Sequence, residues 1–261
     1  MSTAAPSEKP PDHPERERGE RYLTLVEHLQ ELRYRLTVSA IAVVIGLAIS
    51  AYFGTDLIEF LKKPAESRSE DFKLIFTEPF GGFVPYFQVA LLGGLIFAMP
   101  VILYQTLAFV TPGLTSAERR WLQGTVVGAS GLFIAGVAFA YYVALPPALD
   151  FLLNFGDDLA EPNIRLGSYI DFVTRLLFWT GVSFETPLVI MFLAKLRIVS
   201  AWQLIRWWRL AIVGAFVIAA VVTPTIDPVT QSLVAGPIIV LYCLGIGLAF
   251  IVQPREQPDG R

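Results

Sequence analysis

The sequence has few of the residues that form metal and redox sites. It holds one cysteine and two histidines among its 261 residues. A single cysteine excludes an internal disulfide, and Cys243 lies in an apolar run, where a thiol packs as a small hydrophobic group. The sequence also contains no phosphate loop, no Rossmann glycine pattern and no nucleophile elbow. We therefore expect no metal, no cofactor, no nucleic-acid partner and no enzymatic activity.

Charged residues are also scarce. They make up 16% of the chain, against about 25% in soluble domains, whereas hydrophobic residues make up 54%. The hydrophobic residues gather in six long runs, at 36–53, 80–110, 121–145, 169–194, 210–222 and 232–252. A membrane-crossing helix needs about 20 such residues. The pattern therefore predicts an all-α membrane protein with six transmembrane helices.

Prolines and turns divide these runs. We expect a short helix at 56–62, and we expect Pro146 and Pro147 to end the third run. The turn at 223–228 joins the last two runs into a helical hairpin. The fifth run has 13 residues, which is roughly 20 Å of helix against a hydrocarbon core of about 30 Å. We therefore expect the last two helices to be short and the bilayer beside them to be thin.

The two ends of the chain are polar. Residues 1–20 have no large aliphatic side chain after Met1, and we expect them to form a disordered cytoplasmic tail. Residues 21–252 are expected to form one six-helix domain, and residues 253–261 a second cytoplasmic tail. Between residues 23 and 35, apolar side chains recur at helical spacing. This spacing predicts an amphipathic helix at the membrane surface that leads into the first span.

The distribution of lysine and arginine predicts the orientation in the membrane. If the N-terminus is cytoplasmic, 14 of the 20 basic residues fall on the cytoplasmic side or at the helix ends that face it. Membrane proteins keep an excess of Lys and Arg on that side. Because six spans return the chain to the side where it began, we expect both termini in the cytoplasm.

Glu31 is the first candidate functional residue. On a helical wheel it lies opposite the stripe formed by Leu25, Leu29 and Leu32, so it faces the cytosol or a groove. Its spacing to Arg35 is i,i+4, which is typical of a surface ion pair. A carboxylate at this position can also bind a cationic ligand. On the spacing alone, the ion pair with Arg35 is the favoured interpretation.

Two further glutamates are candidates. Glu118 ends a capping box at 115–118, which places its carboxylate at the start of a helix, where it can also accept a cation. Glu185 lies inside the fourth run, 10 residues before Lys195, or roughly 15 Å from the cytoplasmic end. Carboxylates inside a membrane are rare and mostly functional. The alternative for Glu185 is a protonated side chain that hydrogen-bonds a neighbouring helix.

Other polar residues have plainer explanations. Asp171 and Arg175 are spaced as an i,i+4 ion pair at the outer end of the fourth run. Thr223 and Gln231 flank the turn of the last hairpin, where they either stabilise the turn or hydrogen-bond a partner helix in lipid.

Several segments resemble the TatC family. Residues 27–36, Glu-His-Leu-Gln-Glu-Leu-Arg-Tyr-Arg-Leu, are similar to its N-terminal signature. Segments of its first cytoplasmic loop match Pro-Val-Ile-Leu-Tyr-Gln at 100–105, Phe-Val-Thr-Pro-Gly-Leu at 109–114 and Glu-Arg-Arg at 118–120. Gly-Val-Ser-Phe-Glu-Thr-Pro at 181–187 resembles its fourth span. Thr223, Pro224, Asp227 and Gln231 resemble its last outer turn, although the proline pattern there differs.

The resemblance implies a receptor and scaffold of the twin-arginine protein translocase in the bacterial inner membrane. Its six helices would form a curved concave wall. Twin-arginine signal peptides of folded cargo would bind at the cytoplasmic face to Glu31, Glu118 and Phe109, and Arg33 would shape the pocket.

The resemblance also implies roles within the membrane. Glu185 would act during transport, in a polar concavity that water can reach, and Thr223 and Gln231 would contact partner helices. The implied partners are single-span proteins that resemble TatA and TatB, together with further copies of this chain. The complex would be powered by the proton gradient.

A small-molecule or ion transporter is the alternative function, with Glu185 as an intramembrane proton or cation site. Such a site needs further polar groups at the same depth in other spans. The first, second, third and sixth runs supply no charged residue there, which weighs against a transporter.

Overall fold

The computed structural model describes residues 14–68, 74–76, 79, 81–110, 116–154, 164–223 and 228–253, without the side chains of 14–25, 116–121, 154 and 229. The helical elements are α1 (Pro14–Tyr52), α2 (Gly54–Glu66), α3 (Phe83–Val110), α4 (Ser116–Phe139), the π-helical turn η1 (Ala140–Ala144), α5 (Leu145–Asn154), α6 (Leu166–Phe184), α7 (Thr186–Lys195), α8 (Ala201–Arg206), α9 (Trp208–Val222) and α10 (Pro228–Val252). Two short strands, β1 (Leu74–Ile75) and β2 (Ile164–Arg165), pair in parallel.

Six apolar helical stretches account for the expected membrane crossings. Five of those in the described residues are long and apolar enough to span a bilayer, and α9 is a shorter sixth. The five long stretches are Val26–Tyr52, Phe83–Val110, Leu122–Leu153, Leu166–Lys195 and Thr230–Val252. The prediction of an all-α membrane protein is confirmed.

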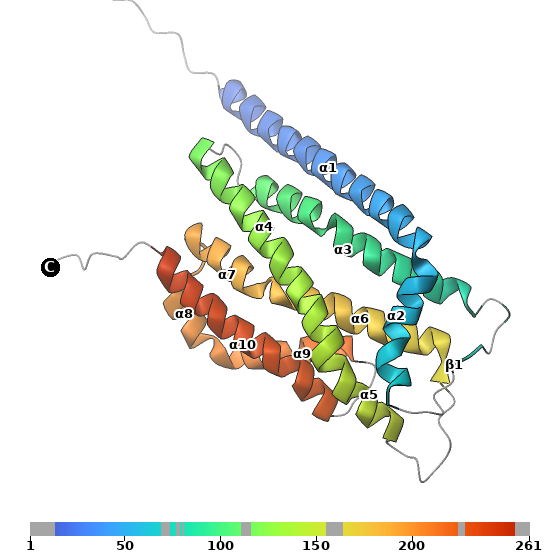
Figure 1. The fold of residues 1–261 in the computed structure, drawn as a ribbon. Helices are drawn as coiled ribbons and strands as arrows, with labels where there is room; N and C mark the ends of the chain where they lie inside the picture. The colour runs from blue at the N-terminus through green and yellow to red at the C-terminus, as the bar shows by residue number, and fades with distance from the viewer. Residues whose placement is uncertain are drawn as a thin grey trace, which may run out of the picture.

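The helices lie side by side as a wall, with α6 and α7 end to end in its middle (Figure 1). Helix α1 packs along α3, helices α3 and α4 pack against α6, and α10 packs against both α7 and α9. Helices α1 and α9 therefore form the two edges of the wall. The start of α1 and the end of α10 lie on the same side of the molecule (Figure 1).

Two glycines bring α1 and α3 into close contact. A Cβ atom added to Gly46 would lie 2.5 Å from the carbonyl oxygen of Gly94. A Cβ atom added to Gly94 would lie 2.6 Å from the backbone nitrogen of Leu47. Small residues let helix backbones approach closely in lipid, where no hydrophobic effect drives helices together. This backbone contact is therefore a main determinant of how α1 sits on α3.

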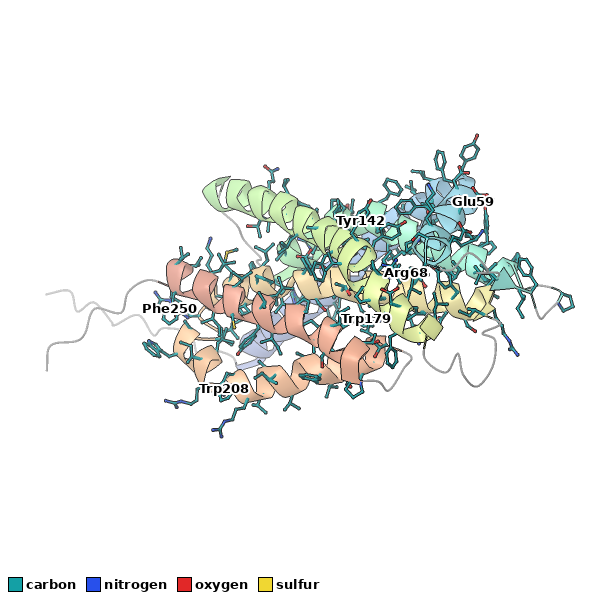
Figure 2. The ribbon with its side chains drawn as sticks, turned by 60° about the horizontal axis from the view of Figure 1, so that its bottom comes forward. Glu59, Arg68, Tyr142, Trp179, Trp208 and Phe250 are labelled. Carbon is teal, nitrogen blue, oxygen red and sulfur yellow. The ribbon has the colours of Figure 1, made fainter. Side chains whose placement is uncertain are left out.

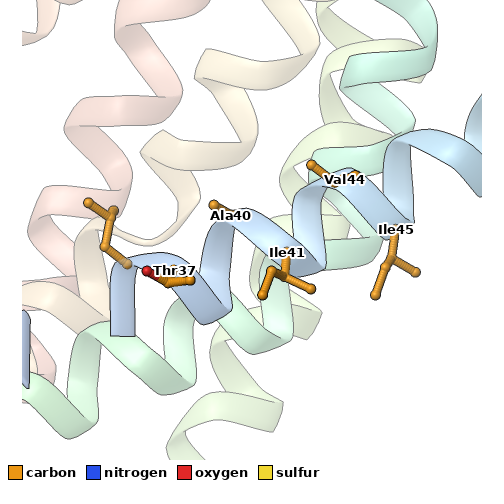
Figure 3. Close-up of a pocket in the computed structure, with 6 residues that line it drawn as sticks. Thr37, Ala40, Ile41, Val44 and Ile45 are labelled. Carbon is orange, nitrogen blue, oxygen red and sulfur yellow. The ribbon is translucent and has the colours of Figure 1, made fainter. Parts of the chain in front are cut away.

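The opposite face of α1 is open. A shallow apolar depression of about 420 Å³ lies along it, and Figure 3 shows side chains that line it. It is lined by Leu36, Thr37, Ala40, Ile41, Val44 and Ile45. Its aliphatic lining suits the hydrocarbon interior of a bilayer.

Helix α2 is fixed across the end of the wall away from the start of α1. The hydroxyl of Tyr141 donates to the Phe60 carbonyl at 2.8 Å, and that of Tyr169 donates to the Leu61 carbonyl at 2.7 Å. Just after α2, Arg68 forms a 2.6 Å ion pair with Asp150 of α5. The loop helix expected at 56–62 is thus present and attached to the spans by its carbonyl groups.

Helix α1 differs from expectation in its first half. It runs without a break from Pro14 to Tyr52, so residues 23–35 continue straight into the span instead of forming a separate surface helix. Residues 14–20, expected within a disordered tail, are helical; residues 1–13 and 254–261 lie outside the described part. The continuity has a simple cause, because no proline or glycine occurs between residues 20 and 45.

The third helical stretch also continues further than expected. Pro146 and Pro147 do not end it, since they lie in the first turn of α5, which reaches Asn154. Proline lacks the backbone N–H that bonds to the residue four positions earlier, so the interior of a regular α-helix normally excludes it. The π-helical turn at Ala140–Ala144 precedes α5 and shifts the hydrogen-bond register before the prolines.

The final hairpin is short in only one of its helices. Helix α9 has 15 residues, roughly 22 Å, but α10 has 25 residues, roughly 37 Å, which is long enough to cross. The prediction of two short helices is therefore wrong for α10, because its apolar run at 232–252 is itself about 20 residues long and the helix begins earlier still, at Pro228. Figure 2 shows Trp208 of α9 and Phe250 of α10 at one end of the molecule, and Glu59 of α2 toward the other.

Candidate functional site

Glu31 and Arg35 form an ion pair on the side of α1 that faces α3. The Nε and Nη2 atoms of Arg35 donate to Oε1 of Glu31 at 2.9 and 2.6 Å. Nη1 of the same guanidinium donates to the side-chain oxygen of Gln105 in α3 at 3.2 Å. Arg35 therefore connects the two helices and holds one oxygen of the Glu31 carboxylate.

A second contact between α1 and α3 lies beside this ion pair. The rings of His28 and Phe109 are stacked, with centroids 4.5 Å apart and an angle of 18° between their planes. Nδ1 of His28 is 4.0 Å from Oε2 of Glu31. The structure thus brings together Glu31 and Phe109, both expected at the site, and adds His28 and Gln105 to them.

The apolar side chains at this end of α1 point away from the site. Leu29 and Leu32 are 63% and 42% exposed, whereas the side chain of Arg35 is only 20% exposed. The polar residues, not the leucines, therefore face the neighbouring helix. The Glu31–Arg35 pair therefore faces α3.

Arg33 and Glu118 are the two other residues expected at the site. Arg33 is exposed, and its carbonyl accepts a hydrogen bond from Thr37 at 2.8 Å. Glu118 lies in the first turn of α4, but its side chain lies outside the described residues. Helix α4 begins on the same side of the molecule as α1 (Figure 1). The proximity of the Glu31 and Glu118 carboxylates therefore stays a prediction.

Glu185 occupies the junction between α6 and α7. Helix α6 ends at Phe184 and α7 begins at Thr186, with Pro187 in the first turn of α7. Glu185 is only 6% exposed, so its side chain does not lie among lipid tails. Its Oε1 has no hydrogen-bond partner among the described residues, and none of their ion pairs includes it. A buried carboxyl group without a partner requires a bound proton or a water molecule.

A third polar cluster lies between α3 and α6. Nε of Arg175 donates to Oδ1 of Asp171 at 2.9 Å, as the i,i+4 spacing predicts. The amide of Gln88 in α3 donates to the same oxygen at 3.4 Å. Asp171 lies near the start of α6, and Glu185 directly follows the end of the same helix.

Thr223 and Gln231 each form a hydrogen bond within the last hairpin. The Thr223 hydroxyl donates to the Ala219 carbonyl at 2.9 Å. The amide of Gln231 in α10 donates to the Phe216 carbonyl of α9 at 3.0 Å. Both contacts fit turn stabilisation, and contact with a partner helix stays a prediction. The described residues contain no cluster of His, Cys, Asp and Glu that could hold a metal ion.

Two contributors, Gln105 and Gln88, were not anticipated. Each lies in a helix that is apolar overall, so helical periodicity gives no reason to select it. The one feature of the sequence that could have selected each glutamine is that it is a polar residue within a long apolar run. His28 was within reach of sequence reasoning, since it precedes Glu31 by three residues and shares its helix face.

Comparison with known proteins identifies the family. The family model "Sec-independent protein translocase protein (TatC)" matches residues 27–237. TatC of Synechocystis sp. is 39% identical over 241 residues, which cover 92% of this chain and 93% of the relative. TatC of Aquifex aeolicus is 40% identical over 237 residues, with 90% and 98% coverage. The chloroplastic TATC protein of Arabidopsis thaliana is 42% identical over 231 residues, which cover 88% of this chain and 66% of that longer protein.

Solved structures agree with this match. Two crystal structures of the twin arginine translocase receptor TatC, one of them in DDM, superpose on this chain with TM-scores of 0.78 and 0.79. Their sequence identities are 39% and 40%, and the superpositions cover 86% and 85% of this chain and 99% of each structure. Nothing in these comparisons supports the transporter alternative. By sequence and by fold, the chain belongs to the TatC family of Sec-independent protein translocase proteins.

Proposed function

We propose that this chain is the receptor and scaffold subunit of a twin-arginine translocase, and that it binds twin-arginine signal peptides through Glu31. The observation that supports this site best is the fit of the Glu31 carboxylate to a guanidinium, since Oε1 accepts two N–H groups of Arg35. Oε2 accepts no hydrogen bond from any described residue, which leaves it available to an arginine of the ligand. Charge-assisted bonds of this kind are among the strongest in proteins.

The remaining site residues have complementary roles. Glu118 supplies a second carboxylate for the second arginine of the signal. Phe109 borders the pocket through its stack on His28. Arg33 cannot bind an arginine directly, because like charges repel, so it shapes the pocket or pairs with a carboxylate.

Crosslinking to a purified signal peptide tests the proposal. A twin-arginine peptide should crosslink to residues around Glu31, and the same peptide with both arginines changed to lysine should do so far less. Equal crosslinking of the two peptides, or crosslinks confined to the opposite face of the membrane, would refute receptor function at this site.

The transport step is assigned to the membrane-embedded residues. Glu185 acts after the signal has bound, in an export site that is assembled with single-span proteins resembling TatA and TatB and driven by the proton gradient. Gln231 uses its amide N–H within the hairpin, and its side-chain oxygen then remains for a partner helix. The protein lies in the bacterial inner membrane as a homo-oligomer, with both termini in the cytoplasm.

A further inference from the structure

The stacked pair of His28 and Phe109 forms a flat surface next to the open oxygen of Glu31. The side chain of His28 is 50% exposed, so one face of the imidazole packs on Phe109 and the rest of the ring is accessible. The 4.0 Å separation between Nδ1 and Oε2 of Glu31 is too long for a hydrogen bond. The ring and the carboxylate are therefore adjacent but not bonded to each other.

Arg35 determines which carboxylate oxygen is available. Its guanidinium holds Oε1 through two N–H groups and is itself fixed to Gln105 at 3.2 Å. Oε2 is then the acceptor on the His28 side. A ligand group that binds Oε2 from this side lies beside the imidazole ring.

We infer that His28, held by Phe109, is a stacking surface for a guanidinium that binds Oε2 of Glu31, and that it makes the site prefer arginine over lysine. A carboxylate alone attracts both cations. A guanidinium is planar, weakly hydrated and stacks on aromatic faces, whereas an ammonium is compact and strongly hydrated. The carboxylate thus attracts either cation, and the ring favours arginine over lysine.

This inference rests on the proposed function, because it assigns a specificity role within the same site. Its position on α1 gives His28 the required reach, since residues three apart lie on the same helix face. The stack on Phe109 restricts the rotation of the imidazole, so little freedom is lost when a ligand binds. Phe109 therefore acts as a positioning residue and His28 as the contact residue.

The test measures two affinities on the full-length protein in detergent. A labelled twin-arginine peptide and its twin-lysine counterpart are titrated against wild type, His28→Ala, His28→Phe and Tyr34→Ala. Tyr34 is an exposed aromatic residue on the same helix and is the matched control. The measured quantity is the ratio of the lysine Kd to the arginine Kd.

We expect His28→Ala to lower this ratio about two- to fivefold, the effect of losing one cation–π contact at an exposed site. His28→Phe keeps a flat ring and should retain most of the ratio, and Tyr34→Ala should leave it unchanged. Phe109→Leu, which keeps the apolar contact but removes the stack, should lower the ratio as well. The inference would be overturned if His28→Ala weakened the binding of both peptides by the same factor. It would also be overturned if His28→Phe lowered the ratio as much as His28→Ala does. Failure of wild type to bind either peptide would instead refute the proposed function itself.

Discussion

Oε1 of Glu31 lies 2.6 Å from Nη2 of Arg35, so the carboxylate expected to bind an external arginine already binds an internal one. Both side chains are partly exposed, at 34% and 20%. Because Arg35 is also bonded to Gln105, it holds Oε1 in place and leaves Oε2 as the acceptor for a ligand arginine.

Glu31→Gln should weaken twin-arginine peptide binding about 10- to 100-fold, because an amide cannot replace the charge in a charge-assisted hydrogen bond. Fluorescence anisotropy with a labelled peptide measures the change. Glu27→Gln is the matched control, since Glu27 is an exposed carboxylate one turn earlier on the same helix. An equal loss in both variants would show that the general negative charge of α1, not the Glu31 site, attracts the peptide.

Glu118→Ala should weaken peptide binding without unfolding the protein, although 87 residues separate Glu118 from Glu31 in the sequence. A paired-arginine ligand needs two acceptors, so the two carboxylates should act together. A double-mutant cycle with Glu31→Gln should give a coupling energy above about 0.5 kcal/mol. Strict additivity would contradict the prediction that the two carboxylates act together on one paired-arginine ligand.

Glu185→Ala should leave peptide binding close to wild type but reduce export of a twin-arginine cargo. The residue is buried at the α6–α7 junction, far along α6 from the Asp171 pair. Glu185→Gln should retain more export than Glu185→Ala, because it keeps a polar group that can hydrogen-bond water. Export by Glu185→Ala at the wild-type rate would remove the residue from the transport step.

Gly46→Ala should destabilise the α1–α3 contact by about 1–3 kcal/mol, since the new Cβ would lie 2.5 Å from the Gly94 carbonyl oxygen. Thermal unfolding in detergent measures the loss. Gly214→Ala in α9 is the control, because a Cβ there meets no atom within 4 Å. Similar melting temperatures for wild type and Gly46→Ala would show that the two helices adjust without cost.

A reporter fused to the C-terminus should behave as cytoplasmic. The start of α1 and the end of α10 lie on one side of the molecule (Figure 1), and the excess of Lys and Arg assigns that side to the cytoplasm. Alkaline phosphatase activity of a C-terminal fusion would contradict this topology, and a green fluorescent protein fusion is the complementary reporter.

The features that sequence reasoning predicted correctly depend on local patterns. The apolar runs and the i,i+4 pairs of Glu31–Arg35 and Asp171–Arg175 all follow from residues close together in the chain. The direction of the leucine stripe on α1 was not predictable, because it depends on which face meets α3.

Long-range contacts are the second class of features that the sequence does not reveal. Gln105 reaches Arg35 across 70 positions, and Gln88 reaches Asp171 across 83. The extension of the third stretch through Pro146 and Pro147 depends on a π-helical turn, which has no strong sequence signal.

The contact between Gly46 and Gly94 has a consequence for the site at the other end of α1. His28 lies 18 residues before Gly46, or roughly 27 Å along a continuous helix. A rotation of an unbroken helix about one contact point displaces its far end most. A change in the crossing angle at the glycine contact would therefore move the His28 end of α1. A small tilt at this contact would change the distance between His28 and Phe109. That distance therefore depends on two residues that have no side chains and lie roughly 27 Å away along the helix.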